Sequence, residues 1–168
     1  MALQVNTTQV NTTLDHWQRI EHLVNIWLKE RQELLTLICS LQGIRGLSAD
    51  VLPAQQRVQR FCEVLMDYIS AGHFEIYREL TNEARLQQRT DQRLVSHIMQ
   101  RLETSTDAAL AFNEEYDTPA HIQQLMDALP ERLSELLEKL EERFALEDQL
   151  ILSIHMGNAA PQRFATLM

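Results

Sequence analysis

Histidine and carboxylate residues are the side chains of this sequence best suited to chemistry, so their spacing decides whether a metal site is expected. A dinuclear metal site in a helical protein uses Glu-x-x-His pairs, because residues three apart share one face of a helix. The residues three positions before the six histidines include no acid: Thr13, Arg19, Ser70, Leu94, Thr118 and Leu152. No two histidines are four residues apart. The sequence therefore predicts no metal site and no cofactor.

Motifs for nucleotide binding and for nucleophilic hydrolysis are also missing from the sequence, which has no P-loop, no G-x-G-x-x-G and no G-x-S-x-G. Asp117 and His121 are four residues apart, but they lie on either side of Pro119. We interpret the carboxylates of LSELLEKLEERFALED, residues 133–148, as a solvated helix face. We expect no enzyme. A metal-binding, hemerythrin-like bundle is the alternative, which elemental analysis would test.

The charge of the chain points to a class of partner. The net charge is −9, from 24 acidic and 15 basic residues, so free nucleic acid and anionic membranes are poor partners and a basic protein is a better one. The longest apolar run, LILSI at 150–154, is too short to cross a bilayer, and no signal peptide is recognised. Cys39 and Cys62 lie in apolar helical patterns, so we expect both to be reduced and buried in a cytoplasmic protein.

The sequence predicts that helices position the side chains discussed above. Gly and Pro number only four each, and good helix formers dominate the composition. Apolar periodicity predicts long helices over about 14–41, from Pro53 to beyond Leu80, from Thr90 or Asp91 to Tyr116, and from about Pro130. A short helix begins after Thr118. The expected fold is all-α, an antiparallel up-down four-helix bundle with one short additional helix.

The expected domain organisation is simple. A repeated QVNTT at 4–13 predicts a flexible N-terminal tail over residues 1–13, with Thr13 as the cap of the first helix. Residues 14–156 then form a single bundle domain, and residues 157–168 form a frayed C-terminal tail.

The segment DYISAGHFEIYREL, residues 67–80, places Gly72 in the middle of a helix. Apolar positions at 58, 62, 65, 69, 72, 76 and 80 keep their period through Gly72, which favours one continuous helix over two. A buried Gly72 would allow a neighbouring side chain to approach closely. Asp67 and Phe74 then share a second face, which is either a binding surface or, alternatively, packed beneath another helix. Leu23 and Trp27 raise the same alternatives, interface or core, on the first helix.

Three segments carry a resemblance to a known family. DYISAGHFEIYREL at 67–80, RFALEDQLIL at 143–152 and HLVNIWLKERQELL at 22–35 resemble signature segments of the Rsd/AlgQ family. The resemblance implies an anti-sigma factor that binds region 4 of the primary (housekeeping) sigma factor, a basic helix-turn-helix module that reads the −35 promoter element. Binding would keep sigma from core RNA polymerase and from promoter DNA.

The resemblance also implies which residues contact the partner. Asp67 and Phe74 match positions that contact sigma, and Leu23 and Trp27 match the neighbouring surface of the first helix. The matched segment also places two further candidates between Asp67 and Phe74: Ser70 and His73.

One departure from the family pattern affects the same surface. Asn25 and Ile26 stand where family members often have an Asp-Arg pair, so a charge there is lost and apolar surface is gained. The alternative function is a bundle that regulates mainly another protein, such as a phosphocarrier, a stringent-response enzyme or a component that controls virulence or exopolysaccharide genes.

Overall fold

The computed structural model describes residues 2–42, 53–87 and 90–158, and all regular structure within these ranges is helical. The predicted all-α class is confirmed. The elements, in chain order, are α1 (Ala2–Gln42), α2 (Ala54–Ala71), the π-helical turn η1 (Gly72–Ile76), α3 (Tyr77–Leu86), α4 (Gln92–Glu115), α5 (Pro119–Gln124), the 3-10 turn η2 (Met126–Ala128) and α6 (Leu129–Asn158).

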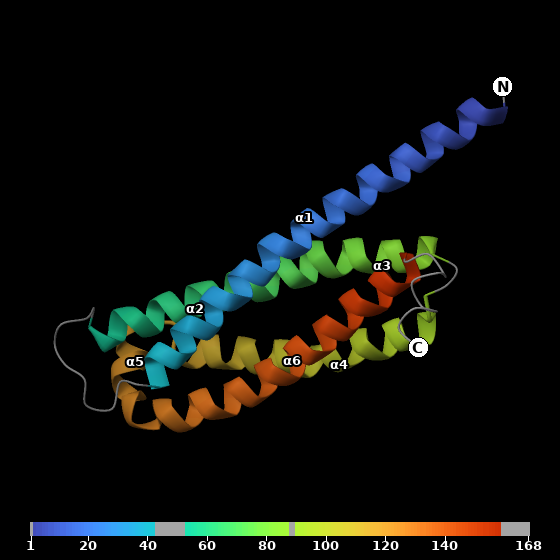
Figure 1. The fold of residues 1–168 in the computed structure, drawn as a ribbon. Coiled ribbons are helices and arrows are strands. Elements are labelled where there is room, and N and C mark those ends of the chain that lie inside the picture. The colour runs from blue at the N-terminus through green and yellow to red at the C-terminus, as the bar shows by residue number, and fades with distance from the viewer. Residues whose placement is uncertain (1, 43–52, 88–89, 159–168) are drawn as a thin grey trace.

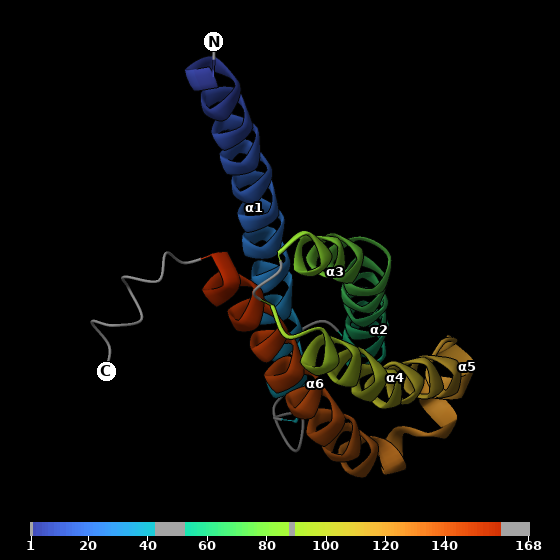
Figure 2. The same ribbon diagram turned by 90° about the vertical axis from the view of Figure 1, so that its right-hand side faces the viewer.

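The long helices surround one core (Figures 1 and 2). α1 packs against α2 and α6, and α4 packs on the opposite side, against α2, α3 and α6. Figure 1 shows α1 inclined across its neighbours, with its N-terminal part extending beyond them. Because of this inclination, the regular antiparallel up-down four-helix bundle stays an expectation rather than a finding.

The predicted apolar stripes form the core. Every position of the stripe through the second helix is buried, from Val58 to Leu80, and so are most of those predicted on the other helices. Near the start of α4, Leu94 continues the apolar pattern of Ile98 and Leu102 but is 39% exposed, while the next residue, Val95, is buried in its place. None of the described helices is long and apolar enough to cross a membrane.

Helix starts follow the predicted capping chemistry. The Asp91 carboxylate accepts hydrogen bonds from the backbone amides of Arg93 and Leu94, at 3.0 and 3.3 Å. The Thr118 hydroxyl accepts one from the amide of His121 at 3.2 Å, with Pro119 in the first turn of α5. These side chains satisfy amides that have no partner within their own helix.

The N-terminal boundary differs from the prediction. α1 begins at Ala2 rather than after Thr13, so residues 2–13, expected as a tail, continue the helix. Adding residues to an existing helix avoids the cost of nucleating a new one, which explains how polar QVNTT repeats can be helical. At the other end α6 continues to Asn158, two residues past the expected boundary. The predicted loop after the first helix, residues 43–52, and residues 159–168 lie outside the described residues.

Candidate functional site: an exposed face and the buried network beneath it

The segment around Gly72 is one continuous helix that contains a π-helical turn. α2 leads directly into η1 and α3, and the amide of Tyr77 bonds to the carbonyl of Gly72, five residues back. The predicted continuity is confirmed. The π turn was not predicted. It adds one residue to the helix, but the buried stripe continues through it, so the apolar spacing gives no sign of the turn.

Trp27 lies against Gly72 in the core. A Cβ atom at position 72 would come within 3.2 Å of Trp27 Cζ2, so only glycine leaves this space open. The indole stacks on Tyr68, with ring centroids 5.1 Å apart and planes at 6°, and meets Tyr77 edge-on at 5.8 Å. Trp27 is only 1% exposed. The structure therefore corrects the expectation that its side chain lies on an exposed partner surface.

The remaining predicted residues lie on or beside one exposed face. Asp67, Ser70, His73 and Phe74 are all exposed along α2 and η1, and Phe74 is 72% exposed. The alternative that Phe74 packs beneath another helix is therefore wrong. Leu23 is half-buried on α1, which contacts η1. We call these exposed residues of α2 and η1, together with Leu23, the partner face.

The partner face is both apolar and acidic. On α1, Ile26 is 44% exposed, and Glu30 follows one turn later. Burial raises the pKa of the Glu30 carboxyl, and the nearby charges of Asp67, Glu33 and Glu75 raise it further. Negative charge from α1, α2 and η1 therefore gathers around Glu30. Sequence reasoning missed Glu30, although its position four residues after Ile26 places the two on one helix face.

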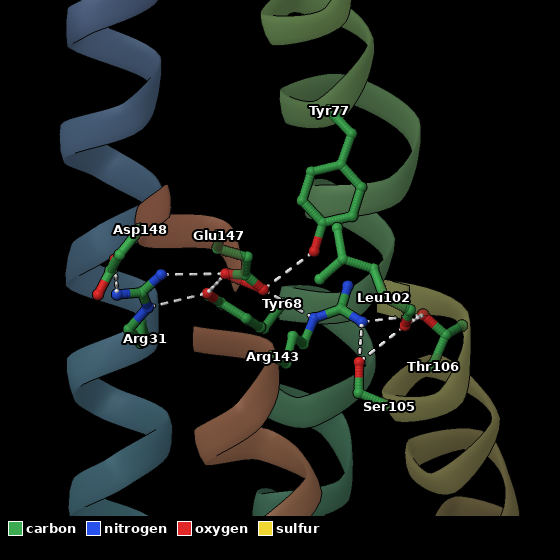
Figure 3. A network of polar contacts seen from close by, with 9 residues as sticks. All are labelled: Arg31, Tyr68, Tyr77, Leu102, Ser105, Thr106, Arg143, Glu147 and Asp148. Atoms are coloured by element: carbon green, nitrogen blue, oxygen red, sulfur yellow. Dashed lines mark hydrogen bonds and ion pairs between the residues drawn. The ribbon is translucent and has the colours of Figure 1, made fainter. Parts of the chain in front are cut away.

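A buried network of polar side chains is centred on Glu147 of α6 (Figure 3). Glu147 is completely buried. The Tyr77 hydroxyl donates to its Oε1 at 2.9 Å, and Arg143 Nε forms an ion pair with the same oxygen at 2.8 Å. The Tyr68 hydroxyl and Arg31 Nη2, the latter at 3.1 Å, donate to Oε2. One carboxylate therefore joins α1, α2, α3 and α6.

The arginine on α1 extends the network toward the surface. Arg31 donates from Nε to the Tyr68 hydroxyl at 3.1 Å and from Nη1 to Asp148 at 2.7 Å. Its guanidinium also lies over the ring of Phe144, 4.9 Å from the centroid. This single side chain fixes α1 against both α2 and α6.

The second arginine extends the network to α4 (Figure 3). Arg143 Nη1 donates to Ser105 Oγ at 3.0 Å and to Thr106 Oγ1 at 2.8 Å. Both hydroxyls donate their own protons to the carbonyl of Leu102, so their lone pairs are free to accept from Arg143. Arg143 is as deeply buried as Glu147.

The protonation of these groups follows from burial and charge. Burial raises the pKa of Glu147, while Arg143, Tyr68 and Arg31 act against that rise. Burial and the Glu147 charge raise the pKa of both Tyr68 and Tyr77, so their hydroxyls keep their protons and donate. The expectation of a solvated face over 133–148 is wrong for Glu147. Its spacing could have revealed this, because Glu147 continues the apolar stripe between Phe144 and Ile151.

The cysteines and histidines form no comparable centre. Cys62 is buried as expected, which raises the pKa of its thiol to about 12, whereas Cys39 is exposed, contrary to expectation. His121 Nδ1 lies 2.9 Å from Asp117 Oδ1 on the surface of α5. Within residues 2–42, 53–87 and 90–158, no three His, Cys, Asp or Glu side chains are grouped as metal ligands would be.

Comparison with known proteins identifies the family. Residues 6–155 match the model described as "Regulator of RNA polymerase sigma(70) subunit, Rsd/AlgQ". The chain belongs to the Rsd/AlgQ family. Proteins named "Regulator of sigma D" are among its relatives. The Yersinia enterocolitica protein is 31% identical over 130 residues, covering 77% of this chain and 78% of its own length. The Pectobacterium atrosepticum protein is 30% identical over 134 residues, covering 79% and 88%.

The Rsd/AlgQ match contains both features described above. The partner face and the Glu147 network lie entirely within residues 6–155. The resemblance first seen in three short segments is therefore a family relationship over most of the chain.

Proposed function

We propose that this chain is an anti-sigma factor. As an antiparallel four-helix bundle in the cytoplasm, it binds region 4 of the primary sigma factor and keeps it from core RNA polymerase and from −35 promoter DNA. The observation that carries the proposal is Phe74, a large aromatic side chain that is 72% exposed on an acidic helix face of an Rsd/AlgQ-family protein. The protein acts by binding rather than by catalysis.

The partner face suits a basic helix-turn-helix module. Phe74 provides an apolar anchor of the kind that dominates binding energy, and Ser70 leaves room beside it for a partner helix. Asp67 is exposed, and its carboxylate would pair with a lysine or arginine of region 4. With a net charge of −9, the protein attracts such a module over a distance, and salt weakens that attraction.

The first helix contributes the edge of the partner face. Leu23 is half-buried, and Ile26 is 44% exposed where family members often carry a charge. An apolar Ile26 extends the contact around Phe74, whereas an arginine there would repel a basic partner. His73 completes the face, with its ring edge-on to Phe74 at 5.0 Å.

Calorimetric titration with isolated region 4 of the host's primary sigma factor, at two salt concentrations, tests the proposal. We expect one-to-one binding that weakens with salt. Phe74→Ala should raise Kd by about 30-fold or more, as loss of an interface anchor does. Asp67→Lys should weaken binding and reduce its dependence on salt.

Matched controls lie on α4, which carries none of the partner face. Leu110 is 50% exposed and Asp107 is exposed, so Leu110→Ala and Asp107→Lys repeat the two changes elsewhere. Both controls should bind as wild type does, apart from the small effect of net charge. If folded Phe74→Ala and Asp67→Lys also bind as wild type does, the partner face is misplaced. If wild type does not bind region 4, the regulator acts on another protein.

A further inference from the structure

The two tyrosines that donate to Glu147 are nine residues apart on one helix. In an α-helix each residue turns about 100°, so nine residues would place Tyr68 and Tyr77 about 180° apart, on opposite faces. Yet both hydroxyls reach the same carboxylate, one at each oxygen. The π turn between them explains this, because its extra residue reduces the offset to about 80°. The contact of Tyr77 with Glu147 therefore depends on the π turn.

The same π turn carries Phe74. Phe74 is the central residue of η1 (Gly72–Ile76), and Tyr77 follows directly after it. If η1 closed into an ordinary α-helical turn, the helix on one side of it would rotate by about 100° relative to the other. Either Tyr77 would leave Glu147, or Phe74 would change its direction relative to Asp67. The outward direction of Phe74 and the inward direction of Tyr77 are thus set together.

The α1 side of the partner face is tied to the same carboxylate. Arg31 donates to Glu147 at 3.1 Å and to the Tyr68 hydroxyl at 3.1 Å. It follows Trp27 by one turn on α1, and Trp27 lies against Gly72. Leu23 precedes Trp27 by one turn on the same side of α1, so the two contacts that fix this part of α1 also fix Leu23.

We propose that Glu147 is the positioning residue of the partner face. It holds the π turn through Tyr77 and holds α1 through Arg31, so that Phe74, Asp67 and Leu23 are arranged for binding before the partner arrives. Glu147 has no exposed surface and touches no partner itself. This inference rests on the proposed function, since it says which buried residue positions the same face. Preorganisation of this kind strengthens binding because less conformational freedom is lost on association.

The network offers its own control. Arg143 connects Glu147 to Ser105 on α4, which lies away from the partner face. Ser105 is 3% exposed and Tyr77 is 2% exposed. The substitutions Ser105→Ala and Tyr77→Phe therefore each remove one hydroxyl group from an equally buried position. Tyr77→Phe removes the hydrogen bond to Glu147, and Ser105→Ala removes the hydrogen bonds to Arg143 and to the Leu102 carbonyl, but only Tyr77→Phe acts on the π turn.

Two measurements on the full chain test the inference. The first is the Kd for isolated sigma region 4, and the second is hydrogen exchange of the backbone amides of residues 73–77 in the free protein. Tyr77→Phe should raise Kd about tenfold, within the usual range of coupling between sites, and should speed exchange in this segment. Ser105→Ala should leave both values unchanged, even where denaturation shows a similar loss of stability.

The outcomes are distinct. If wild type and Tyr77→Phe bind region 4 equally well, the positioning role is wrong while the proposed function stands. If Tyr77→Phe and Ser105→Ala weaken binding equally, the effect is general instability, and the inference is again overturned. If wild type does not bind region 4, the proposed function and the positioning role fall together.

Discussion

Trp27 fills the space that Gly72 leaves open: a Cβ at position 72 would lie 3.2 Å from Trp27 Cζ2 and 3.4 Å from the ring of Tyr77. The indole cannot easily move away, because Tyr68 stacks on it and Tyr77 meets it edge-on. Gly72 is therefore a packing requirement, and the side chain it admits links α1 to the π turn that displays Phe74.

We expect Gly72→Ala to destabilise the protein. Alanine gains about 0.5–1 kcal/mol in a helix relative to glycine, but overpacking of a filled core costs about 1–3 kcal/mol. Because Trp27 is confined, the cost of overpacking should exceed the gain in helix propensity, with a net loss of about 1 kcal/mol in the free energy of unfolding. Urea denaturation followed by circular dichroism measures this difference.

A double-mutant cycle with Trp27→Phe provides the control for Gly72→Ala. The smaller ring leaves room for the new methyl group, so Gly72→Ala should cost less in the Trp27→Phe background. An equal cost in both backgrounds would show that the loss does not come from this contact.

The exposed face of α2 and η1 was predictable from sequence only in part, and the network around Glu147 was not. Asp67 and Phe74 sit off the buried stripe, but helical periodicity left open whether they face solvent or pack beneath another helix. Trp27 shows the limit of that reasoning, because its spacing fits both core and interface, and only the gap at Gly72 decides between them. The α-helical period also cannot reveal a π turn, since the apolar positions 69, 72, 76 and 80 fit both geometries.

The main error of the sequence-based prediction was to place a buried charged residue on the surface. The Glu147 carboxylate was placed on a solvated face because charged residues are rarely buried unless they are paired. Arg143 pairs with Glu147 within α6, but the other partners of Glu147 are distant in sequence, with Arg31 and Tyr68 on other helices. The prediction that Cys39 is buried was also wrong. Apolar residues lie near it along the chain, but its side chain faces solvent.

Glu147→Ala should be among the most destabilising single substitutions in the core. It leaves Arg31 and Arg143 without their shared carboxylate, and breaking a buried ion pair costs about 3–5 kcal/mol. In a chain of this size, each 1 kcal/mol lowers Tm by about 2–4 °C. Thermal denaturation measures the loss. Glu138→Ala on the exposed side of the same helix is the matched control and should change Tm little. Equal shifts would contradict the assigned role.

The two cysteines should differ sharply in reactivity. Cys39 is exposed, whereas burial raises the pKa of the Cys62 thiol to about 12. At pH 8 we expect iodoacetamide to modify Cys39 in the folded protein and both cysteines in urea, counted by mass spectrometry. Cys39→Ser is the control and should remain unmodified when folded. Rapid modification of Cys62 in the native protein would show that the interface between α2 and α4 opens readily.

The tyrosines should resist ionisation until the protein unfolds. All three have a raised pKa, each chiefly because of burial: Tyr68, Tyr77 and Tyr116. A raised pKa means that the folded state favours the neutral hydroxyl over the phenolate. The stability from these groups is therefore fully present below pH 10, the ordinary value, and is lost as the pH rises above it.

Ultraviolet absorbance of phenolate during an alkaline titration, with circular dichroism recorded in parallel, tests this expectation. In urea the tyrosines should ionise with a midpoint near pH 10. In the folded protein the phenolate signal should appear only at higher pH, together with the loss of helical signal, because the Tyr68 and Tyr77 hydroxyls must leave Glu147 to ionise. Tyr116→Phe should reduce the amplitude without removing this coupling. Ionisation near pH 10 with the helices intact would mean that the network around Glu147 is open to water.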